Sequence, residues 1–265
     1  MKKFKALLLS FAMVLALTGC GSKENNDNAA DVKTESDDSN AADVKSEGVM
    51  THAEYIAAAV DTEVVIEAYV QAKQSWWKDS TSGKEQATVY AQDKDGAYFL
   101  YNMECSEADY KKLTEGTKIK VTGHKAEWSG EVEIVDATFE IMEGNYVAKA
   151  LDVTDLLGKD DLVKHQNEFV SFKGMTVAPS KDADGNEVAY LYKWDGSGQE
   201  GDDLYFNVSV NDQVYNFTVE SYLCGSDTDV YKAVKNLKVG DTVDMEGFLY
   251  WYEGANPHIT SVTVK

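Results

Sequence analysis

The side chains able to do acid–base, nucleophilic or metal chemistry are scattered along this sequence of 265 residues. The four histidines are His52, His124, His165 and His258, and they lack the spacing of metal ligands. The sequence contains no GxSxG, HExxH or phosphate-binding glycine loop. Its 46 acidic residues are expected to be solvated surface rather than acid–base pairs. We therefore expect no enzyme, no cofactor and no metal site.

The segment Asp182-Ala183-Asp184-Gly185-Asn186 has the acidic spacing with which a calcium-binding loop begins. The glycine that such a loop requires next is replaced by Glu187, and its twelfth position holds Lys193 where a glutamate is required. A hairpin turn explains this segment better than a metal site does.

Alternation of apolar and polar residues predicts a mainly all-β protein. In the first half the predicted order is strand, strand, strand, helix, strand, strand. The strands are expected at Val64–Val70, Ala87–Gln92, Ala97–Met103, Thr117–Gly123 and Glu131–Met142, and the helix at 106–113 with Ser106 as its cap. The capping box Thr51-His52-Ala53-Glu54 predicts a shorter helix before them, and Asp93–Gly96 a hairpin turn with Gly96 at positive φ.

The second half repeats the first at a spacing of 124 residues. The matching pairs are Leu113 and Leu237, Gly116 and Gly240, Ile119 and Val243, Val121 and Met245, Gly123 and Gly247, Trp128 and Tyr252, and Gly130 and Gly254. Strands are expected at Phe169–Val177, Val188–Trp194, Leu204–Val210 and Val214–Val219, with a loop at 196–203, a turn at Asn211-Asp212 and a helix over 227–237 after Ser226. Two similar domains are therefore predicted.

Two segments carry a resemblance to a known fold. Thr88-Val89-Tyr90-Ala91-Gln92-Asp93 and Gly116-Thr117-Lys118-Ile119-Lys120-Val121-Thr122-Gly123 resemble the second and fourth strands of OB-fold domains. The chain looks like bacterial lipoproteins that carry OB-type domains related to nucleic-acid-binding modules. The resemblance covers residues 60–143 well and 165–265 less well. It implies two tandem five-stranded Greek-key barrels, each with a helix between strands three and four.

Aromatic residues are the candidates for ligand binding. In an OB-fold, the loops after the first and fourth strands flank the usual ligand face. The resemblance places Trp76 and Trp77 in the first of these loops and Trp128 in the second, with Tyr90, Phe99 and Tyr101 on the strands between them. Comparable places in the second half hold Trp194, Tyr250, Trp251 and Tyr252. Two alternatives remain open: Trp77 and Trp128 belong to the core, or they are buried against the second domain.

The N-terminus reads as a secretory signal. Lys2, Lys3 and Lys5 precede the mostly apolar run 7–17, which is too short for an ordinary membrane-spanning helix. The run ends in Leu17-Thr18-Gly19-Cys20, which resembles the bacterial lipobox. That resemblance implies cleavage before Cys20, a lipid such as palmitate on its thiol, and anchoring at the extracytoplasmic face of the cell membrane. The alternative is a secreted soluble protein with an incidental cysteine.

The predicted organisation has four segments. Residues 1–19 form the signal peptide, and 20–49 the lipidated Cys20 with a disordered linker. Residues 50–143 form the N-terminal helix and first barrel, and 144–265 a linker and the second barrel. The segment 21–49 has no aromatic residue and contains the near-repeat of 29–35 and 41–47, so it buries too little apolar surface to fold. Cys105 and Cys224 fall in separate domains, and we expect both thiols to be free and buried.

Charge limits the partners. The net charge is −21, and residues 1–49 contribute six Lys against eight Asp or Glu, so about −19 belongs to residues 50–265. We expect no non-specific nucleic-acid binding at physiological salt, although the family resemblance implies nucleic acid, because such binding needs Lys and Arg to neutralise phosphates. A small molecule, a saccharide or a cationic peptide is favoured instead. An assembly subunit that docks on other envelope proteins is the competing class.

We predict that Cys20 is the membrane anchor. Its acyl chains hold the chain at the membrane, because each buried methylene contributes about 0.8 kcal/mol. In Cys20→Ala no lipid is attached, so the protein is expected to leave the membrane fraction. Fractionation of cells followed by immunoblotting measures this, and normal processing with unchanged membrane retention would contradict it.

Overall fold

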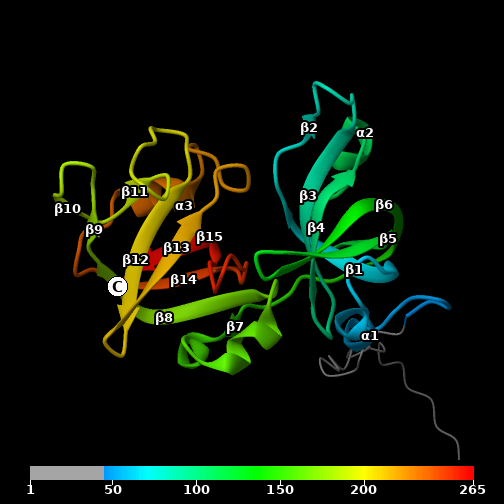
Figure 1. Cartoon of the computed structure of the whole chain (residues 1–265), viewed down its shortest axis with the longest axis horizontal. Coiled ribbons are helices and arrows are strands. Elements are labelled where there is room, and N and C mark those ends of the chain that lie inside the picture. The colour runs from blue at the N-terminus through cyan, green and yellow to red at the C-terminus, as the bar shows by residue number, and fades with distance from the viewer. Residues whose placement is uncertain (1–44) are drawn as a thin grey trace, which may run out of the picture. The chain divides into compact units, whose positions relative to one another are not determined.

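The computed structural model describes residues 45–265, which form two β-barrels (Figure 1). The predicted signal peptide, Cys20 and most of the predicted linker lie outside the described residues. Among residues 45–265, no helix has the length and apolar character needed to cross a membrane.

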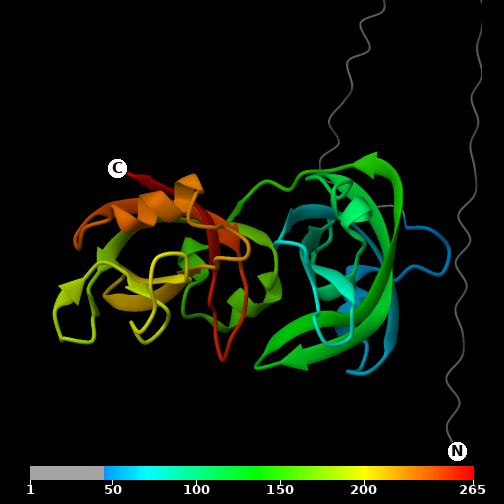
Figure 2. The ribbon, with the colours of Figure 1, turned by 90° about the horizontal axis from the view of Figure 1, so that it is seen from above.

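The first barrel contains five principal strands and one short helix. They are β1 (Glu63–Lys73), β3 (Glu85–Gln92), β4 (Ala97–Glu104), α2 (Glu107–Tyr110), β5 (Thr117–Trp128) and β6 (Glu131–Asn145). The two-residue strand β2 (Trp77–Lys78) pairs with β3 at the edge. Neighbouring strands follow the order β1-β5-β6-β4-β3, and an added β1–β3 pairing closes the ring. In Figure 2 the long green strands, β5 and β6, curve around this barrel.

The second barrel has the same topology. Its elements are β8 (Phe169–Ala178), β12 (Leu204–Val210), β13 (Gln213–Val219), α3 (Asp229–Lys235), β14 (Thr242–Phe248) and β15 (His258–Val264). Neighbouring strands follow β12-β13-β15-β14-β8, and β12 also pairs with β8. In each barrel the third and fifth strands are parallel, β4 with β6 and β13 with β15, while the other principal pairs are antiparallel. This is the OB-fold arrangement, so the predicted tandem OB-fold-like barrels are confirmed.

Each barrel encloses its own apolar core. In β3, Val89 and Ala91 face the interior of the first barrel while Tyr90 between them belongs to a different cluster, as period-two alternation predicts. The second barrel is filled by a larger set that includes Phe172, Phe206 and Phe217. The two cores are separate, so each barrel has an interior of its own.

The repeated glycines have matching structural roles. Gly116 and Gly240 both have positive φ, and their N–H groups donate to Val70 O at 2.7 Å and Val177 O at 2.9 Å. Gly123 and Gly247 lie at register shifts in β5 and β14. A Cβ on Gly247 would lie 2.2 Å from the backbone oxygen of His258, so this crossing needs glycine. The 124-residue repeat therefore marks backbone contacts that close the barrels.

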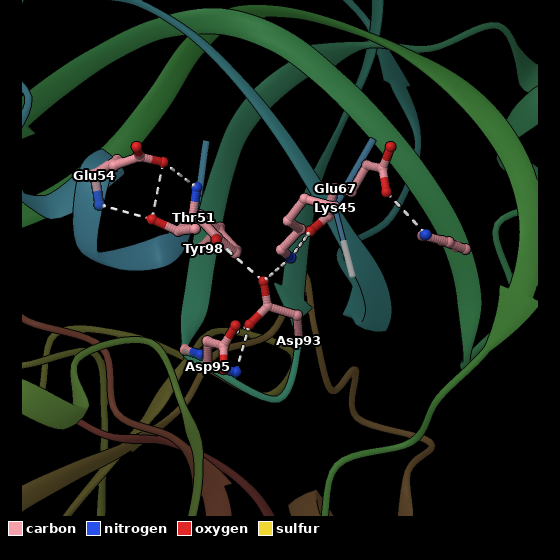
Figure 3. A network of polar contacts seen from close by, with 9 residues as sticks. Lys45, Thr51, Glu54, Glu67, Asp93, Asp95 and Tyr98 are labelled. Atoms are coloured by element: carbon pink, nitrogen blue, oxygen red, sulfur yellow. Dashed lines mark hydrogen bonds and ion pairs between the residues drawn. The ribbon is translucent and has the colours of Figure 1, made fainter. Parts of the chain in front are cut away.

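Helix α1 (His52–Ala57) covers the start of the first barrel and is capped at both ends. Thr51 and Glu54 form the predicted capping box, which Figure 3 shows, with the Thr51 N–H donating to Glu54 Oε2 at 2.8 Å. At the other end, the buried ammonium of Lys125 donates to the carbonyls of Tyr55, Ile56 and Ala58 at 2.7–3.1 Å. A lysine from β5 thus satisfies carbonyls that a helix of six residues leaves unpaired.

Asp93 organises the turn between β3 and β4 (Figure 3). Its Oδ1 accepts the N–H groups of Asp95 at 2.7 Å and Gly96 at 2.9 Å, and its Oδ2 accepts the hydroxyl of Tyr98 at 3.1 Å. The hairpin turn is confirmed, but Gly96 does not have the predicted positive φ. Gly96 is required for another reason, because a Cβ there would lie 2.3 Å from the ring of His52.

The sequence predicts a disordered linker up to residue 49, but its last five residues, 45–49, are ordered. The ammonium of Lys45 forms an ion pair with Asp93 Oδ2 and donates to Glu67 O at 2.8 Å (Figure 3). The side chain of Lys45 is 8% exposed and that of Asp93 is fully buried. Since the carboxylate and Lys45 compensate each other's charge, residues 45–49 are ordered against the first barrel, which corrects the prediction for this stretch.

In the second barrel, the segment between β8 and β12 differs from the prediction. The strand expected at Val188–Trp194 is reduced to β10 (Glu187–Val188) and β11 (Leu191–Tyr192), which lie in a long loop. The turn expected at Asp182–Asn186 is confirmed, because β9 (Ser180–Lys181) pairs with β10 around it. The loop at 196–203 and the turn at Asn211-Asp212, where both residues have positive φ, are confirmed as well.

Two further expectations concern caps and cysteines. The cap of α3 is Thr228 rather than Ser226, because the Thr228 hydroxyl accepts the N–H of Tyr231. Cys105 and Cys224 are free and buried, as predicted. The segment between the barrels contains β7 (Leu151–Asp152) and two 3₁₀ helices, η1 (Thr154–Leu156) and η2 (Asp160–His165).

We expect Gly247→Ala to lower the free energy of unfolding by about 1–3 kcal/mol, because its methyl group would overlap the backbone of β15. Urea denaturation followed by far-UV circular dichroism measures this. Gly225→Ala is the control, since its Cβ would lie 3.3 Å from a movable side-chain oxygen of Asp227. Equal stabilities for the two variants would contradict the crossing argument.

Candidate functional site

A buried aromatic cluster joins the two barrels. The described residues belong to one compact unit, and Tyr90 and Phe99 of the first barrel pack against Phe248 of the second. The rings of Tyr90 and Phe248 are stacked at 4.5 Å, and Phe99 meets Tyr250 edge-on at 5.3 Å. The strand face on which OB-folds usually place a ligand is therefore covered here by the neighbouring barrel.

The polar groups in this cluster are paired and uncharged. Burial lowers the pKa of His258 to about 3, so its ring is neutral at pH 7. The hydroxyl of Tyr90 forms a hydrogen bond with His258 Nδ1 at 2.7 Å. Burial also raises the pKa of Tyr90 well above its ordinary value. The cluster thus holds two polar side chains without burying a charge.

Tyr90 and Phe99 are 1% and 3% exposed, and their rings contact residues of the second barrel. They offer no free face to a ligand, which corrects the prediction that placed them on an open binding surface. Burial against the second domain was left open from the sequence for Trp77 and Trp128. The structure shows it instead for these two strand residues.

The other predicted site residues are at least partly accessible. Trp77 lies on β2 and is 41% exposed, Tyr101 lies on β4 and is 46% exposed, and Trp128 ends β5 and is 53% exposed. Neither Trp77 nor Trp128 is therefore a core residue. Trp76 is half-buried, and its indole N–H donates to Cys105 O at 2.9 Å. Trp76 lies between β1 and β2, directly before Trp77.

Trp128 meets its own counterpart in the repeat. Its ring centroid lies 5.2 Å from that of Tyr252, with the two planes at 41°. Tyr252 is 48% exposed, so both rings keep a face toward solvent. These two residues, called here the aromatic pair, lie at the end of β5 and in the loop after β14, the fourth strands of the two barrels.

Hydrogen bonds hold the two loops of the aromatic pair together. The N–H of Glu253 donates to Ser129 O at 2.7 Å, and the side-chain amide of Gln166 donates to Gly130 O at 2.8 Å. A Cβ on Gly130 would lie 2.9 Å from the ring of Trp251, so the glycine permits this contact. The pair is therefore positioned by backbone groups on both sides of the contact between the barrels.

Glu131 lies beneath these loops and is 0% exposed. Its Oε2 accepts the N–H of Trp251 at 2.9 Å and the amide of Gln166 at 3.3 Å. Burial raises the pKa of Glu131 to about 8, although hydrogen bonds from the Asn167 side chain and the Trp251 N–H oppose the shift. Burial likewise raises the pKa of Glu220 to about 7. Burial therefore favours the protonated form of both carboxyls, and more strongly for Glu131.

Sequence reasoning named Trp128 and its counterpart Tyr252 but did not predict that they meet, and it missed what lies between the barrels. Phe248 and His258 carry no motif, and Glu131 is one acidic residue among 46. The signal for Trp128 and Tyr252 was their shared place in the repeat. Among residues 45–265, no group of three or more His, Cys, Asp or Glu side chains is placed to hold a metal ion.

The chain was compared with known proteins. No protein-family model matches it, and no curated protein matches it. Among solved structures, the HINa domain of Ifi202 in complex with 20-bp double-stranded DNA is 11% identical, with a TM-score of 0.34, and the match covers 77% of this chain and 98% of that chain. A Replication Protein A heterotrimer bound to single-stranded DNA is 12% identical, with a TM-score of 0.32, over 77% of this chain and 49% of that chain.

A murine DNA-binding protein bound to double-stranded DNA is also 12% identical, with a TM-score of 0.32, over 76% of this chain and 97% of that chain. Similarity at this level names no ligand for the present chain. The OB-fold assignment rests on its strand order and on the parallel pairing of the third and fifth strands in each barrel.

The raised pKa of Glu131 predicts that the free energy of unfolding of the protein depends on pH. Since its pKa is raised by folding from 4.5 to about 8, the folded state holds a proton that the unfolded chain loses, and stability falls as pH rises through this window. Glu131→Gln cannot ionise. Relative to the wild type, its free energy of unfolding is expected to rise by about 1–4 kcal/mol between pH 4.5 and 8.5.

Urea denaturation at several pH values measures this difference, with Glu115→Gln as the control at an exposed position. A difference between Glu131→Gln and the wild type that stays constant over this range would show that Glu131 does not titrate there.

Proposed function

We propose that this chain is a non-enzymatic binding module, held at the outer face of a cell membrane by lipid on Cys20, that binds cationic groups at the aromatic pair of Trp128 and Tyr252. The observation that carries the ligand proposal is the meeting of these two half-exposed rings, 5.2 Å apart, on loops fixed by both barrels.

The aromatic pair has the geometry of a small open cradle. Its rings are tilted by 41° and are about half exposed, so a ligand group can contact both. Aromatic faces attract cations through the negative potential of the ring, an effect worth about 0.5–2 kcal/mol per contact. An exposed pair held in place by backbone hydrogen bonds loses little freedom when a ligand arrives.

The charge around the aromatic pair favours a cation over an anion. Glu127 and Glu253 are direct neighbours of the two rings in sequence, and both are exposed. The nearest lysine in sequence, Lys125, is buried and holds the end of α1. With about −19 on residues 50–265, the surrounding field draws cationic peptides toward the surface. A lysine-rich peptide is therefore the ligand class that we propose.

Nucleic acid is the alternative that the resemblance to OB-fold modules implies, and the solved structures named above include DNA complexes. Strong binding of phosphates releases counterions from a basic surface. This sequence has 25 basic residues against 46 acidic ones, and all 25 are lysines. It therefore lacks arginine, which pairs with phosphates through two hydrogen bonds and stacks on bases. The face bearing Tyr90 and Phe99 is also covered.

Fluorescence anisotropy of a labelled twelve-residue oligolysine, titrated with the purified full chain, tests the ligand proposal. We expect saturable binding that weakens with salt, and a loss of about 2- to 30-fold in affinity in Trp128→Ala and in Tyr252→Ala. Trp194→Ala is the matched control, because Trp194 is 75% exposed and lies outside the aromatic pair.

Equal affinities for Trp128→Ala and Trp194→Ala would rule out the aromatic pair as the site. A labelled single-stranded oligonucleotide serves as the polyanion in the same assay. Micromolar affinity for it with a steep salt dependence would favour nucleic-acid binding instead. Isolation of the chain in a stable complex with another envelope protein, without oligolysine binding, would favour an assembly subunit.

A further inference from the structure

A buried carboxylate in the first barrel receives a lysine from the segment that precedes α1. The ammonium of Lys45 forms an ion pair with Asp93 Oδ2 and donates to the backbone oxygen of Glu67 at 2.8 Å (Figure 3). Tyr98 donates its hydroxyl to the same carboxylate oxygen at 3.1 Å, and the other oxygen accepts N–H groups of its own turn. Since the Lys45 side chain is only 8% exposed, the barrel encloses the ammonium group instead of meeting it at the surface.

The residue after Lys45 makes a second contact with the barrel. The Ser46 hydroxyl is hydrogen-bonded to the carboxylate of Glu67, which also pairs with Lys118 at 2.8 Å. Burial opposes ionisation of Glu67, but the hydrogen bonds from Lys118 and Ser46 outweigh it and lower the pKa of this carboxyl. The groups of Glu67, Asp93 and Tyr98, called here the lysine site, therefore bind a lysine that is followed by a hydroxyl residue.

The sequence contains this pair of residues twice in the same surroundings. Residues 29–35 read AADVKTE, and residues 41–47 read AADVKSE. The lysine of the earlier copy is Lys33, and Thr34 after it carries a hydroxyl, as Ser46 does. The two side-chain groups that the later copy places in the lysine site are thus also present in the earlier copy, 12 residues before.

The residues that follow the two copies differ, and they favour the later copy. After it the chain passes through Gly48, which has a φ of 78°, and the N–H of Met50 donates to Val65 O at 2.8 Å. The earlier copy has Ser36 at the position of Gly48, and a residue with a Cβ seldom adopts positive φ. We therefore expect the later copy to bind more tightly, and it is the copy whose lysine the structure shows in the site.

We propose that residues 29–35 are a second occupant of the lysine site, in which Lys33 replaces Lys45 within the same chain. When Lys45 leaves, the carboxylate of Asp93 is buried without that ammonium group beside it, which is a costly state. A second lysine in matching surroundings removes this cost. The exchange lengthens the segment between the bound lysine and α1 by 12 residues, and the entropic cost of closing a loop rises only with the logarithm of its length.

The exchange alters the length of chain between Cys20 and the first barrel. With Lys33 in the lysine site, 12 residues fewer separate Cys20 from the barrel than with Lys45 in place. The chain then has two tether lengths, a longer one with the later copy bound and a shorter one with the earlier copy bound. This consequence rests on the membrane anchoring proposed above, whereas the exchange itself does not.

Melting temperatures of the purified full chain test the exchange through two substitutions. Lys33→Ala alone is expected to leave the melting temperature unchanged, because Lys45 already occupies the lysine site. In the Lys45→Ala background, Lys33→Ala is expected to lower it by about 3–10 °C, because neither copy then supplies a lysine to Asp93. Lys23→Ala in the same background is the matched control, since Lys23 lies outside both copies, and it is expected to have no effect.

Limited digestion with trypsin, which cleaves after lysine, shows which copy occupies the lysine site. Cleavage after Lys33, followed by mass spectrometry, is expected to be about 10-fold slower in Lys45→Ala than in the wild type, because a bound lysine must leave the site before it is cut. Cleavage after Lys23 is expected to keep its rate and serves as the internal reference.

Four results would overturn the proposal. The first is that Lys45→Ala is no more stable than the double variant Lys33→Ala/Lys45→Ala, and a Lys45→Ala chain that fails to fold belongs here, since Lys33 would give no rescue. The second is an equal effect of Lys23→Ala and Lys33→Ala in the Lys45→Ala background. The third is an unchanged rate of cleavage after Lys33. The fourth is dimerisation of Lys45→Ala in sedimentation, because the site would then take a lysine from a second copy.

Discussion

The contact between Tyr90 and Phe248 is the interaction on which the remaining surface of this protein depends. It buries the open strand face of the first barrel against the second barrel, together with Phe99 and Tyr250. A ring stack of this kind is favourable only if the polar atoms that it covers are paired. The bond between the Tyr90 hydroxyl and the neutral ring of His258 meets that condition.

Closing the strand face leaves exposed aromatic residues only around its edge in this part of the molecule. Tyr90 and Phe99 are covered by the second barrel. Trp128 and Tyr252 stay about half exposed, and their rings lie against each other. The same closure buries Glu131 and thereby raises its pKa. The contact thus combines an apolar centre with a buried carboxyl, Glu131, whose ionisation is opposed by burial.

Much of the fold could be predicted from the sequence because the barrels depend on local signals. Apolar alternation defined the strands, and the glycines spaced by 124 residues marked the places where the backbone crosses closely. The failures have physical causes. The stretch 188–194 alternates like a strand but finds only two-residue pairings in its loop. Lys45 lies in a polar segment, and its burial depends on Asp93, which is 48 residues away.

The candidate site was less predictable because it is made by two barrels at once. No local sequence signal shows whether Tyr90 faces a ligand or packs against Phe248. A ligand site and a contact between barrels would each place an aromatic residue on the outer face of β3. The repeat nevertheless placed Trp128 and Tyr252 at equivalent positions of the two barrels. In the structure these two equivalent residues contact each other. Two copies of one module therefore form, at their junction, an aromatic pair that neither barrel presents alone.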